Sequence, residues 1–471
     1  MFVDKDVTQR TAAPTQRTER LDSHVAGREA PDAYHRGLLQ ALRASDPRIY
    51  DWIAAEYDRL ADSLQLIAAE NRCSRAVLGA LGSILQNKTT EGFAGSRFHG
   101  GCHVVDQIER LAVERAKQAF GARYANVQPH SGTAANHIVF TALLDRDDVI
   151  LHLALDQGGH VSHGASVSFT GRFFRAEPYN VDRRTHLLDY EAIRQQALRV
   201  GPKLIVCGAS AYARVIDFER FRAIADEVGA YLVADVSHVA GLIAAGAHPS
   251  PIDEAHLTTT STYKPGGPRG GLILMGRDYD RPVTVGSRTR PLWEQIDKTT
   301  FPGFQGTPCL NNIAAKAVFF NEVMSEEYRD RQFRIVENAK VLAQALADLG
   351  FDVLTGGTDN HMVLVDVAQF RDGLTGAVAQ KALEDCGIIV NMNRLPYDPR
   401  PQAVTSGMRL GTPIVTSNGM GPQHMRLISE MVRDTLDRVR PTGDRSYQLD
   451  ETFQTEMRRT VRDLCRSFPL R

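Results

Sequence analysis

The sequence predicts an α/β protein whose central sheet is mostly parallel. Short, continuously apolar runs alternate with helical patterns between about residues 105 and 285. Strands that are apolar on both faces are typical of a parallel sheet with helices packed on each side. The length of 471 residues exceeds that of an ordinary single domain, which favours two domains and an appended arm.

Three parts are expected in chain order. Residues 1–44 are polar and show no apolar periodicity, so we expect a flexible N-terminal extension. Residues 45–310 should form an N-terminal arm helix, which starts at a Ser-Asp-Pro signal, and a large domain. Residues 311–471 should form a long connecting helix and a smaller C-terminal α/β domain.

The individual elements follow from apolar runs and from helical periodicity. The clearest helix is 217–229, whose apolar residues recur on one face and which ends at a glycine. A long helical connection is expected near 310–345, and a further helix near 373–386. The expected strands are 149–155, 203–208, 230–236 and 271–276 in the large domain, with 362–367 and 387–391 in the smaller one.

Charge and composition argue against several functions. The net charge of -1 provides no general attraction to nucleic acid or to an anionic membrane. The apolar runs are too short to cross a bilayer, and the N-terminal residues lack the apolar core of a secretory signal. The six cysteines include no CxxC pair, so we expect no disulfide framework, no metal site and a cytoplasmic location.

One short segment, TTTSTYKPGGPRGG at 258–271, places a single lysine, Lys264, between a hydroxyl run and a glycine run. Asp235 stands near the end of one apolar strand and Ser210 follows another, and doubly wound sheets bind ligands at such ends. The Ser-Gly-Thr of 131–133 precedes an expected helix, whose N-terminus suits a phosphate, although the same triplet is common as a simple helix cap. An amine, a carboxylate, a hydroxyl and a phosphate cradle together are the groups that pyridoxal phosphate requires.

Longer motifs extend this pattern along most of the chain. They include LIAAEN, NKTTEGFAGSRFHGGCHVVDQIE, YANVQPHSGTAAN, GGHVSHG, ADVSHVAGLIAAGAHPSP, FPGFQGTP, GGTDNHMVLVD and TSGMRLGTP. Between about residues 45 and 440 the sequence resembles the serine hydroxymethyltransferases. The resemblance implies a fold-type-I pyridoxal-phosphate transferase with a seven-stranded, mostly parallel sheet. It also implies an amino acid substrate, tetrahydrofolate as co-substrate, and a homodimer or tetramer with shared active sites.

The resemblance further assigns roles to single residues. Lys264 would form the Schiff base, Asp235 would pair with the pyridine nitrogen, and His160 would stack on the ring. Arg409 would bind the substrate carboxylate, and Glu91 would handle protons between substrate and folate. Further cofactor contacts are expected from Ser131, Gly132, Thr133, Ser210, His238, Tyr263, Gly306 and Thr307, with His238 also counted as catalytic. The expected folate pocket comprises Leu155, Gly159, Val161, Phe301, Pro302 and Asn393.

Departures from the family pattern gather at this expected site. The family has Ser where this chain has Ala69, Tyr where it has Thr89, and Gly where it has Thr307. A family Tyr pair is replaced by Phe98 and His99, and the His before the lysine is replaced by Tyr263. Ala69, Thr89 and His99 are expected to contact the substrate.

The motifs NKTTEG and RFHGG resemble the 2-methylserine branch of the family. The smaller residues would make room for an α-methyl group, because overpacking a tight site costs about 1–3 kcal/mol. We therefore expect the enzyme to cleave or form the Cα–Cβ bond of 2-methylserine or serine. Two alternatives are a folate-independent aldolase or L-threonine transaldolase, and a catalytically silent binding paralogue of the same fold.

Overall fold

The structure is a computed structural model that describes residues 37–470. Most of the expected N-terminal extension, residues 1–36, lies outside this range. The chain falls into two units, which divide between Tyr57 and Asp58. The described part of the first unit contains helix α3 (Leu38–Ser45), at the end of the expected extension, and most of α4 (Pro47–Ala61), which is the expected arm helix.

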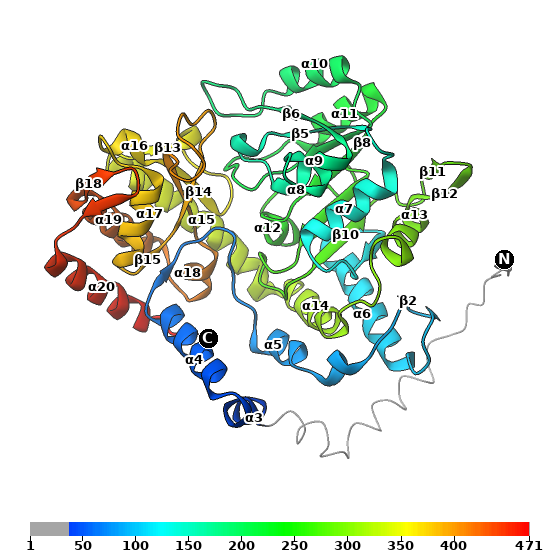
Figure 1. Cartoon of the computed structure of the whole chain (residues 1–471), viewed down its shortest axis with the longest axis horizontal. Helices are drawn as coiled ribbons and strands as arrows, with labels where there is room; N and C mark the ends of the chain where they lie inside the picture. Colours follow the sequence, from blue (N-terminus) through cyan, green and yellow to red (C-terminus); the bar gives the residue numbers. More distant parts are fainter. Residues whose placement is uncertain (1–36, 471) are drawn as a thin grey trace. The chain divides into compact units, whose positions relative to one another are not determined.

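A seven-stranded sheet forms the centre of the second unit (Figure 1). In spatial order its strands are β4 (Tyr124–Asn126), β10 (Gly271–Met275), β9 (Leu257–Ser261), β8 (Tyr231–Asp235), β7 (Leu204–Cys207), β5 (Val149–Leu153) and β6 (Arg175–Tyr179). The strands from β9 to β6 pair in parallel, whereas β10 is antiparallel to both of its neighbours. The prediction of a mostly parallel, seven-stranded sheet is therefore confirmed.

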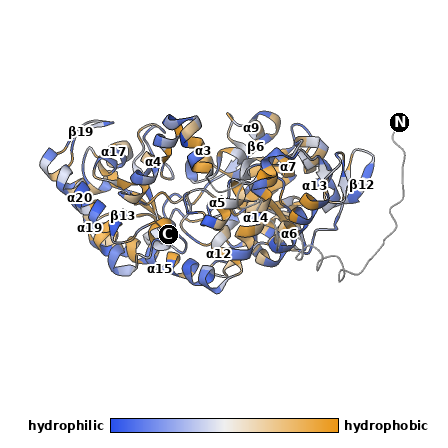
Figure 2. Cartoon of the chain, turned by 90° about the horizontal axis from the view of Figure 1, so that it is seen from below, coloured by the Kyte–Doolittle hydropathy of each residue, from blue (hydrophilic) through white to orange (hydrophobic). Residues whose placement is uncertain are grey.

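Both faces of this sheet are buried, which explains why its strands read as continuous apolar runs. Along β7, Leu204 and Val206 enter one hydrophobic core, while Ile205 and Cys207 enter the core on the opposite face. The covering helices are α6 (His103–Phe120), α7 (Gly132–Leu143), α10 (Tyr190–Val200), α11 (Phe218–Val228), α12 (Ala240–Ala244), α13 (Leu292–Lys298) and α14 (Leu310–Val323). Figure 2 shows α7 and α14 as largely hydrophobic, as expected for helices with buried faces.

A second sheet of four antiparallel strands lies in the C-terminal part of the chain. Its order is β13 (Asp352–Val353), β14 (Met362–Asp366), β17 (Gly407–Gly411) and β16 (Asn391–Asn393). The helices α15 (Glu326–Asp348), α17 (Gly376–Asp385), α19 (Pro422–Arg438) and α20 (Glu451–Arg466) contribute to a separate hydrophobic core with this sheet. The C-terminal α/β part predicted from the sequence is thus present.

Two sequence-based expectations differ from the structure in detail. The long connecting helix is two helices, because Ser325 caps the start of α15 by accepting a hydrogen bond from the Tyr328 amide. The expected strand 387–391 is split into β15 (Ile388–Ile389), which pairs in parallel with β1 (Leu64–Gln65), and β16. Each half therefore has a different partner strand.

The remaining elements are short. They are α5 (Arg75–Leu81), β2 (Gly92–Phe93), β3 (Ser96–Arg97), α8 (Val161–Gly164), α9 (Phe169–Phe173), β11 (Pro282–Val285), β12 (Arg288–Pro291), α16 (Val367–Phe370), α18 (Pro413–Ser417), β18 (Arg440–Gly443) and β19 (Ser446–Gln448), with helical turns at Ile84–Asn87, Leu155–Gln157, Thr299–Phe304 and Leu354–Gly356. Across residues 37–470, none of the helices combines the length and the apolar character that a membrane span needs.

Candidate active site

A cavity of about 220 Å³ lies where β8 and β9 end and α7 begins. The residues predicted for the cofactor site that line it are Ser131, Gly132, Thr133, His160, Asp235, Tyr263 and Lys264. Parallel strands end at the same edge of a sheet, so residues far apart in the chain meet there. The structure therefore brings the predicted amine, carboxylate and helix N-terminus into one cavity.

The first turn of α7 forms one side of this cavity. The Oγ atom of Ser131 accepts a hydrogen bond from the Ala134 amide at 3.0 Å and so caps the helix. A Cβ atom at Gly132 would lie 3.2 Å from both the Cβ and the amide nitrogen of Ser261. Glycine therefore lets the helix start lie close to the end of β9, and the first-turn amides form a positive end suited to an anion.

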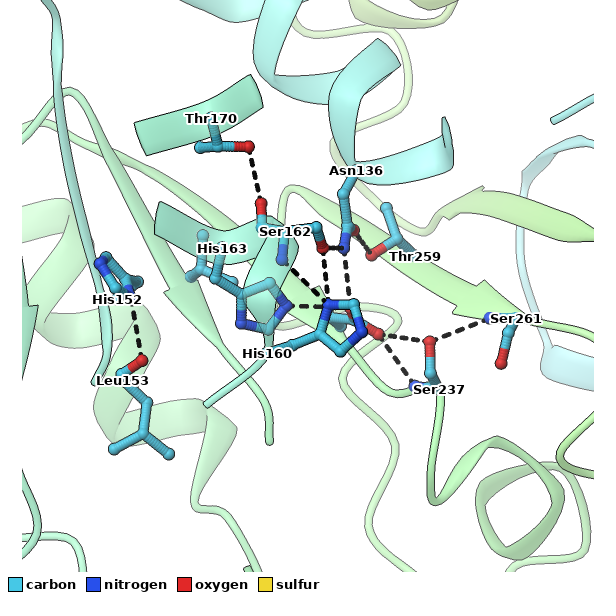
Figure 3. A network of polar contacts seen from close by, with 12 residues as sticks. Asn136, His152, Leu153, His160, Ser162, His163, Thr170, Ser237, Thr259 and Ser261 are labelled. Carbon is cyan, nitrogen blue, oxygen red and sulfur yellow. Dashed lines mark hydrogen bonds and ion pairs between the residues drawn. The ribbon is translucent and has the colours of Figure 1, made fainter. Parts of the chain in front are cut away.

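Asp235 lies at the end of β8 and is almost completely buried. Figure 3 shows three of the side chains that surround it, Asn136, His163 and Ser237. The Oδ2 atom of Asp235 accepts hydrogen bonds from Asn136 Nδ2 at 2.8 Å and from His163 Nε2 at 3.0 Å. Its Oδ1 atom accepts from the amide and the hydroxyl of Ser237, at 3.0 and 2.6 Å. Burial alone would raise the pKa of Asp235, but the hydrogen bond and the charge of His163 hold that pKa well below its usual range. The side chain is therefore a carboxylate at neutral pH.

Asn136 connects this carboxylate to His160. Its amide nitrogen also donates to Ser162 Oγ at 3.0 Å, while its amide oxygen accepts from Thr259 Oγ1 at 2.6 Å. Ser162 Oγ lies 2.8 Å from His160 Nδ1, and the Ser162 amide also donates to that nitrogen. These two donors assign Nδ1 as the acceptor and Nε2 as the protonated nitrogen. Burial and the charge of His163 lower the pKa of His160 to about 4, so its imidazole is neutral at pH 7.

The Lys264 loop closes the other side of the cavity. The Nζ atom of Lys264 lies 3.3 Å from Ser261 Oγ and 4.9 Å from the ring centroid of Tyr263. The guanidinium carbon of Arg269 lies 4.2 Å from the same centroid, so this arginine packs on the ring that precedes the lysine. The Thr262 amide donates to the Gly270 carbonyl at 3.0 Å, which brings the two ends of the loop together.

Arg409, Ser210 and His238 lie outside the lining of this cavity. The guanidinium of Arg409 donates to the Ser210 carbonyl and, through Nε, to Asn391 Oδ1 at 3.1 Å. Burial lowers the pKa of Arg409 to about 10, which still leaves it charged at neutral pH. Burial holds the pKa of His238 well below its usual range, and its ring stacks on His361 with centroids 5.8 Å apart.

A model of the family described as serine hydroxymethyltransferase matches residues 42–432. This range covers most of the chain. The chain belongs to the serine hydroxymethyltransferase family. Serine hydroxymethyltransferases are fold-type-I, pyridoxal-phosphate-dependent hydroxymethyltransferases that use tetrahydrofolate, and the sheet described above agrees with that fold.

The cavity residues of this serine hydroxymethyltransferase fit pyridoxal phosphate. Asp235 is an ionised carboxylate in a buried position, which is what a protonated pyridine nitrogen requires as a partner. Lys264 presents an amine on the same cavity, and the start of α7 presents its amides. His160, His163 and Asp235 have possible metal-ligating atoms within 4.8 Å of one another, but Asp235 already accepts a hydrogen bond from His163. The donor set therefore suits the family's cofactor.

Several members of this network were not identified from the sequence, namely Asn136, Ser162, His163 and Ser237. The spacing in GGHVSHG was an available signal for His163, because residues three apart on a helical turn lie on the same side. Asn136 likewise stands four residues after Gly132 on α7. The pairing of His163 with a carboxylate 72 residues later in the chain required the fold.

The residues predicted for substrate protons and for folate do not line the Lys264 cavity of the same chain. Glu91 lies beside Gly306, because a Cβ there would be 3.6 Å from Glu91 Oε1. The β2–β3 turn that follows Glu91 is held in place by Arg97. The buried side chain of Arg97 forms ion pairs with Asp106 (2.9 Å) and Glu109 (2.6 Å).

The remaining predicted residues differ in exposure and position. Thr89 and His99 are exposed, whereas Ala69 and Thr307 are half-buried. Among the predicted folate residues, Leu155 and Val161 are exposed, Gly159 is buried, and Asn393 is half-buried on β16. Phe301 and Pro302 are joined by a cis peptide bond.

Proposed function

We propose that this enzyme transfers the hydroxymethyl group of 2-methylserine to tetrahydrofolate, with serine as a poorer substrate. The supporting observation is a contrast between the intact cofactor cavity and the smaller residues at two positions that are predicted to contact the substrate. Both carboxylate oxygens of Asp235 have hydrogen-bond donors, while Ala69 and Thr89 are smaller than the serine and tyrosine of the family pattern. Such a site keeps the cofactor chemistry and gains room for a quaternary α-carbon.

Each residue of the proposed site has a task in this reaction. Bound pyridoxal phosphate supplies an electron-withdrawing ring that stabilises the charge left on the α-carbon when the Cα–Cβ bond breaks. Lys264 would hold the cofactor, and Asp235 would keep its ring nitrogen protonated. Arg409 would bind the substrate carboxylate through two parallel hydrogen bonds. The neutral His160 would pack on the ring without adding a positive charge beside it.

Atoms balance if the hydroxymethyl carbon passes to folate at the oxidation level of formaldehyde. 2-Methylserine and tetrahydrofolate would then give D-alanine, methylenetetrahydrofolate and water. The β-hydroxyl proton must leave as the Cα–Cβ bond breaks, and Glu91 is the proposed acceptor. A carboxylate suits this task because it can take the proton and return it within one turnover.

The position of Glu91 supports a homodimer with shared active sites. Glu91 and Gly306 lie next to each other on this chain, yet neither lines its own Lys264 cavity. In the proposed dimer both would serve the cavity of the partner subunit. A cytoplasmic location is also part of the proposal, and the free state of all six cysteines supports it.

A substrate panel tests the proposal. Both isomers of 2-methylserine, L-serine, L-threonine and D-alanine are assayed with and without tetrahydrofolate. The expected result is a higher kcat/KM for 2-methylserine than for serine, with alanine as product and with turnover dependent on folate. Folate-independent cleavage, or a preference for threonine, would instead support the aldolase or transaldolase. An absorbance scan that shows no bound cofactor would support the silent paralogue.

A further inference from the structure

Lys316 is a buried lysine that the proposed reaction does not use. It lies on α14 with only 1% of its surface exposed. Its Nζ atom donates to three main-chain carbonyls, those of Val127 at 2.6 Å, Gly271 at 2.7 Å and Pro129 at 3.2 Å. An ammonium group has three hydrogens, so this arrangement satisfies all of them.

The three carbonyls belong to the two segments that build the cofactor cavity. Val127 and Pro129 lie between β4 and α7, directly before the cap residue Ser131. Gly271 is the first residue of β10 and ends the glycine run after Lys264. The Gly271 amide also donates to the Pro129 carbonyl at 2.9 Å. Lys316 therefore bonds both segments at the place where they already contact each other.

The glycines at this contact are required by the close approach. A Cβ atom at Gly270 would lie 2.4 Å from Lys316 Cε and 2.8 Å from its Nζ. A Cβ atom at Gly271 would lie 2.1 Å from the Ser131 carbonyl oxygen. The last two glycines of the Lys264 segment therefore leave space for the Lys316 side chain and for the loop that leads into α7.

Burying an ammonium without a carboxylate partner is costly, and burial lowers the pKa of Lys316 to about 7. Within the described part of the chain, no ion pair to Lys316 is present at bonding distance. An apolar residue of similar volume would avoid this cost, so fold stability alone is a weak reason for a lysine here. A lysine can hold the carbonyls of a functional loop in place through hydrogen bonds, whereas an apolar side chain cannot.

We propose that Lys316 is a positioning residue for cofactor binding, which holds the loop 127–131 against Gly271 and so sets the phosphate cradle at the start of α7. The inference rests on the proposed binding of the phosphate by residues 131–133. It predicts that Lys316 matters for ligands that carry the phosphate and much less for ligands that lack it.

The test compares two ligands on the apoprotein. Pyridoxal 5'-phosphate and pyridoxal are each titrated by absorbance into wild type, Lys316→Met and the exposed-lysine control Lys340→Met, with circular dichroism to confirm folding. Lys316→Met should weaken the binding of pyridoxal phosphate by about tenfold or more, because it removes the charge-assisted hydrogen bonds that hold the phosphate cradle in place. Its affinity for pyridoxal should stay close to that of wild type, and Lys340→Met should change neither.

A second variant covers the case in which Lys316→Met does not fold. Gly270→Ala keeps the lysine but places a methyl group against its end, so it should also weaken pyridoxal phosphate selectively. When Gly270→Ala is combined with Lys316→Met, the affinity for pyridoxal phosphate should fall little further than in Lys316→Met alone, because both changes act on one contact. Equal losses for both ligands, or unchanged affinity in both variants, would overturn the positioning role. If wild type itself binds the two ligands equally well, the phosphate assignment fails instead.

Discussion

His163 Nε2 lies 3.0 Å from Asp235 Oδ2, and both side chains are almost fully buried. This pair joins α8 to the end of β8, where Asp235 lines the cofactor cavity. Asn136 donates to the same carboxylate oxygen from α7. The charge of Asp235 is therefore fixed by donors from several elements, and the network can be tested at its centre and at its edge.

Asp235→Asn tests the centre of the network. We expect the variant to bind pyridoxal phosphate but to lose several orders of magnitude in turnover, because an amide cannot stabilise a protonated ring nitrogen. The measurement is α-proton exchange of the amino acid product by NMR, with cofactor binding followed by absorbance. Asp226→Asn, an exposed change on α11, is the control. Near-normal exchange in Asp235→Asn would contradict the assignment of this carboxylate.

His163→Leu tests the edge of the network. It removes one donor from Asp235 and leaves those from Asn136 and Ser237. A hydrogen bond to a charged group contributes about 1.5–3 kcal/mol, so kcat should fall by about 10- to 150-fold, with a smaller change in KM. His103→Leu, at an exposed position on α6, is the control. A change confined to KM would indicate that His163 acts on substrate binding instead.

Lys264→Ala should abolish turnover while the protein remains folded. Lys264 is the lysine that lines the cavity beside Asp235. Borohydride reduction of the wild-type holoenzyme followed by peptide mapping should place the cofactor label on Lys264. The same treatment of Lys264→Ala should leave no label, and a label on any other lysine of the wild type would refute the assignment.

Thr89→Tyr tests the proposed substrate. Restoring the tyrosine of the family pattern should fill the space left for an α-methyl group, so the preference should shift from 2-methylserine towards serine. The ratio of kcat/KM for the two amino acids in wild type and variant measures this shift. Overpacking costs about 1–3 kcal/mol, which corresponds to a change of about 5- to 150-fold in the ratio. An unchanged ratio would remove the enlarged-pocket argument and favour the transaldolase.

Buried histidines should make the apoprotein sensitive to acid. Burial lowers the pKa of His152 and of His361 to about 4, whereas an unfolded histidine titrates near 6.5. Between those values the unfolded state binds more protons, so each residue contributes stability that is lost as pH falls from about 6.5 to 4. Each histidine should make the free energy of unfolding fall by up to about 1.4 kcal/mol for each pH unit of acidification in this range.

Urea unfolding of the apoprotein across this pH range measures the effect. The free energy of unfolding should depend less on pH in His152→Gln than in wild type, by up to the contribution of one proton. His186→Gln, the same substitution at a half-buried position, is the control. If the free energy of unfolding changes equally with pH in wild type and His152→Gln, His152 does not take up a proton on unfolding in this pH range.

Much of the fold could be predicted because its elements are signalled locally. The strands β5, β7, β8 and β10 all lie within the predicted apolar runs, and α11 lies within the predicted helix. Chain order then favours a parallel sheet. The break between α14 and α15 differs from the prediction because the helical pattern of the sequence continues through both helices. Only a single serine cap, at the start of α15, marks the break.

The sequence by itself determined the family, the cofactor and the residues with a recognisable motif, such as Lys264, Asp235 and the 131–133 triplet. Only the tertiary structure decided which other side chains support them. Nothing adjacent in sequence marks Asn136, His163 or Lys316 as partners of that site, because their contacts join segments that are 72 to 189 residues apart. Local patterns report the backbone preferences of a segment, whereas the charge of a buried carboxylate and the position of a loop depend on which groups folding places around them.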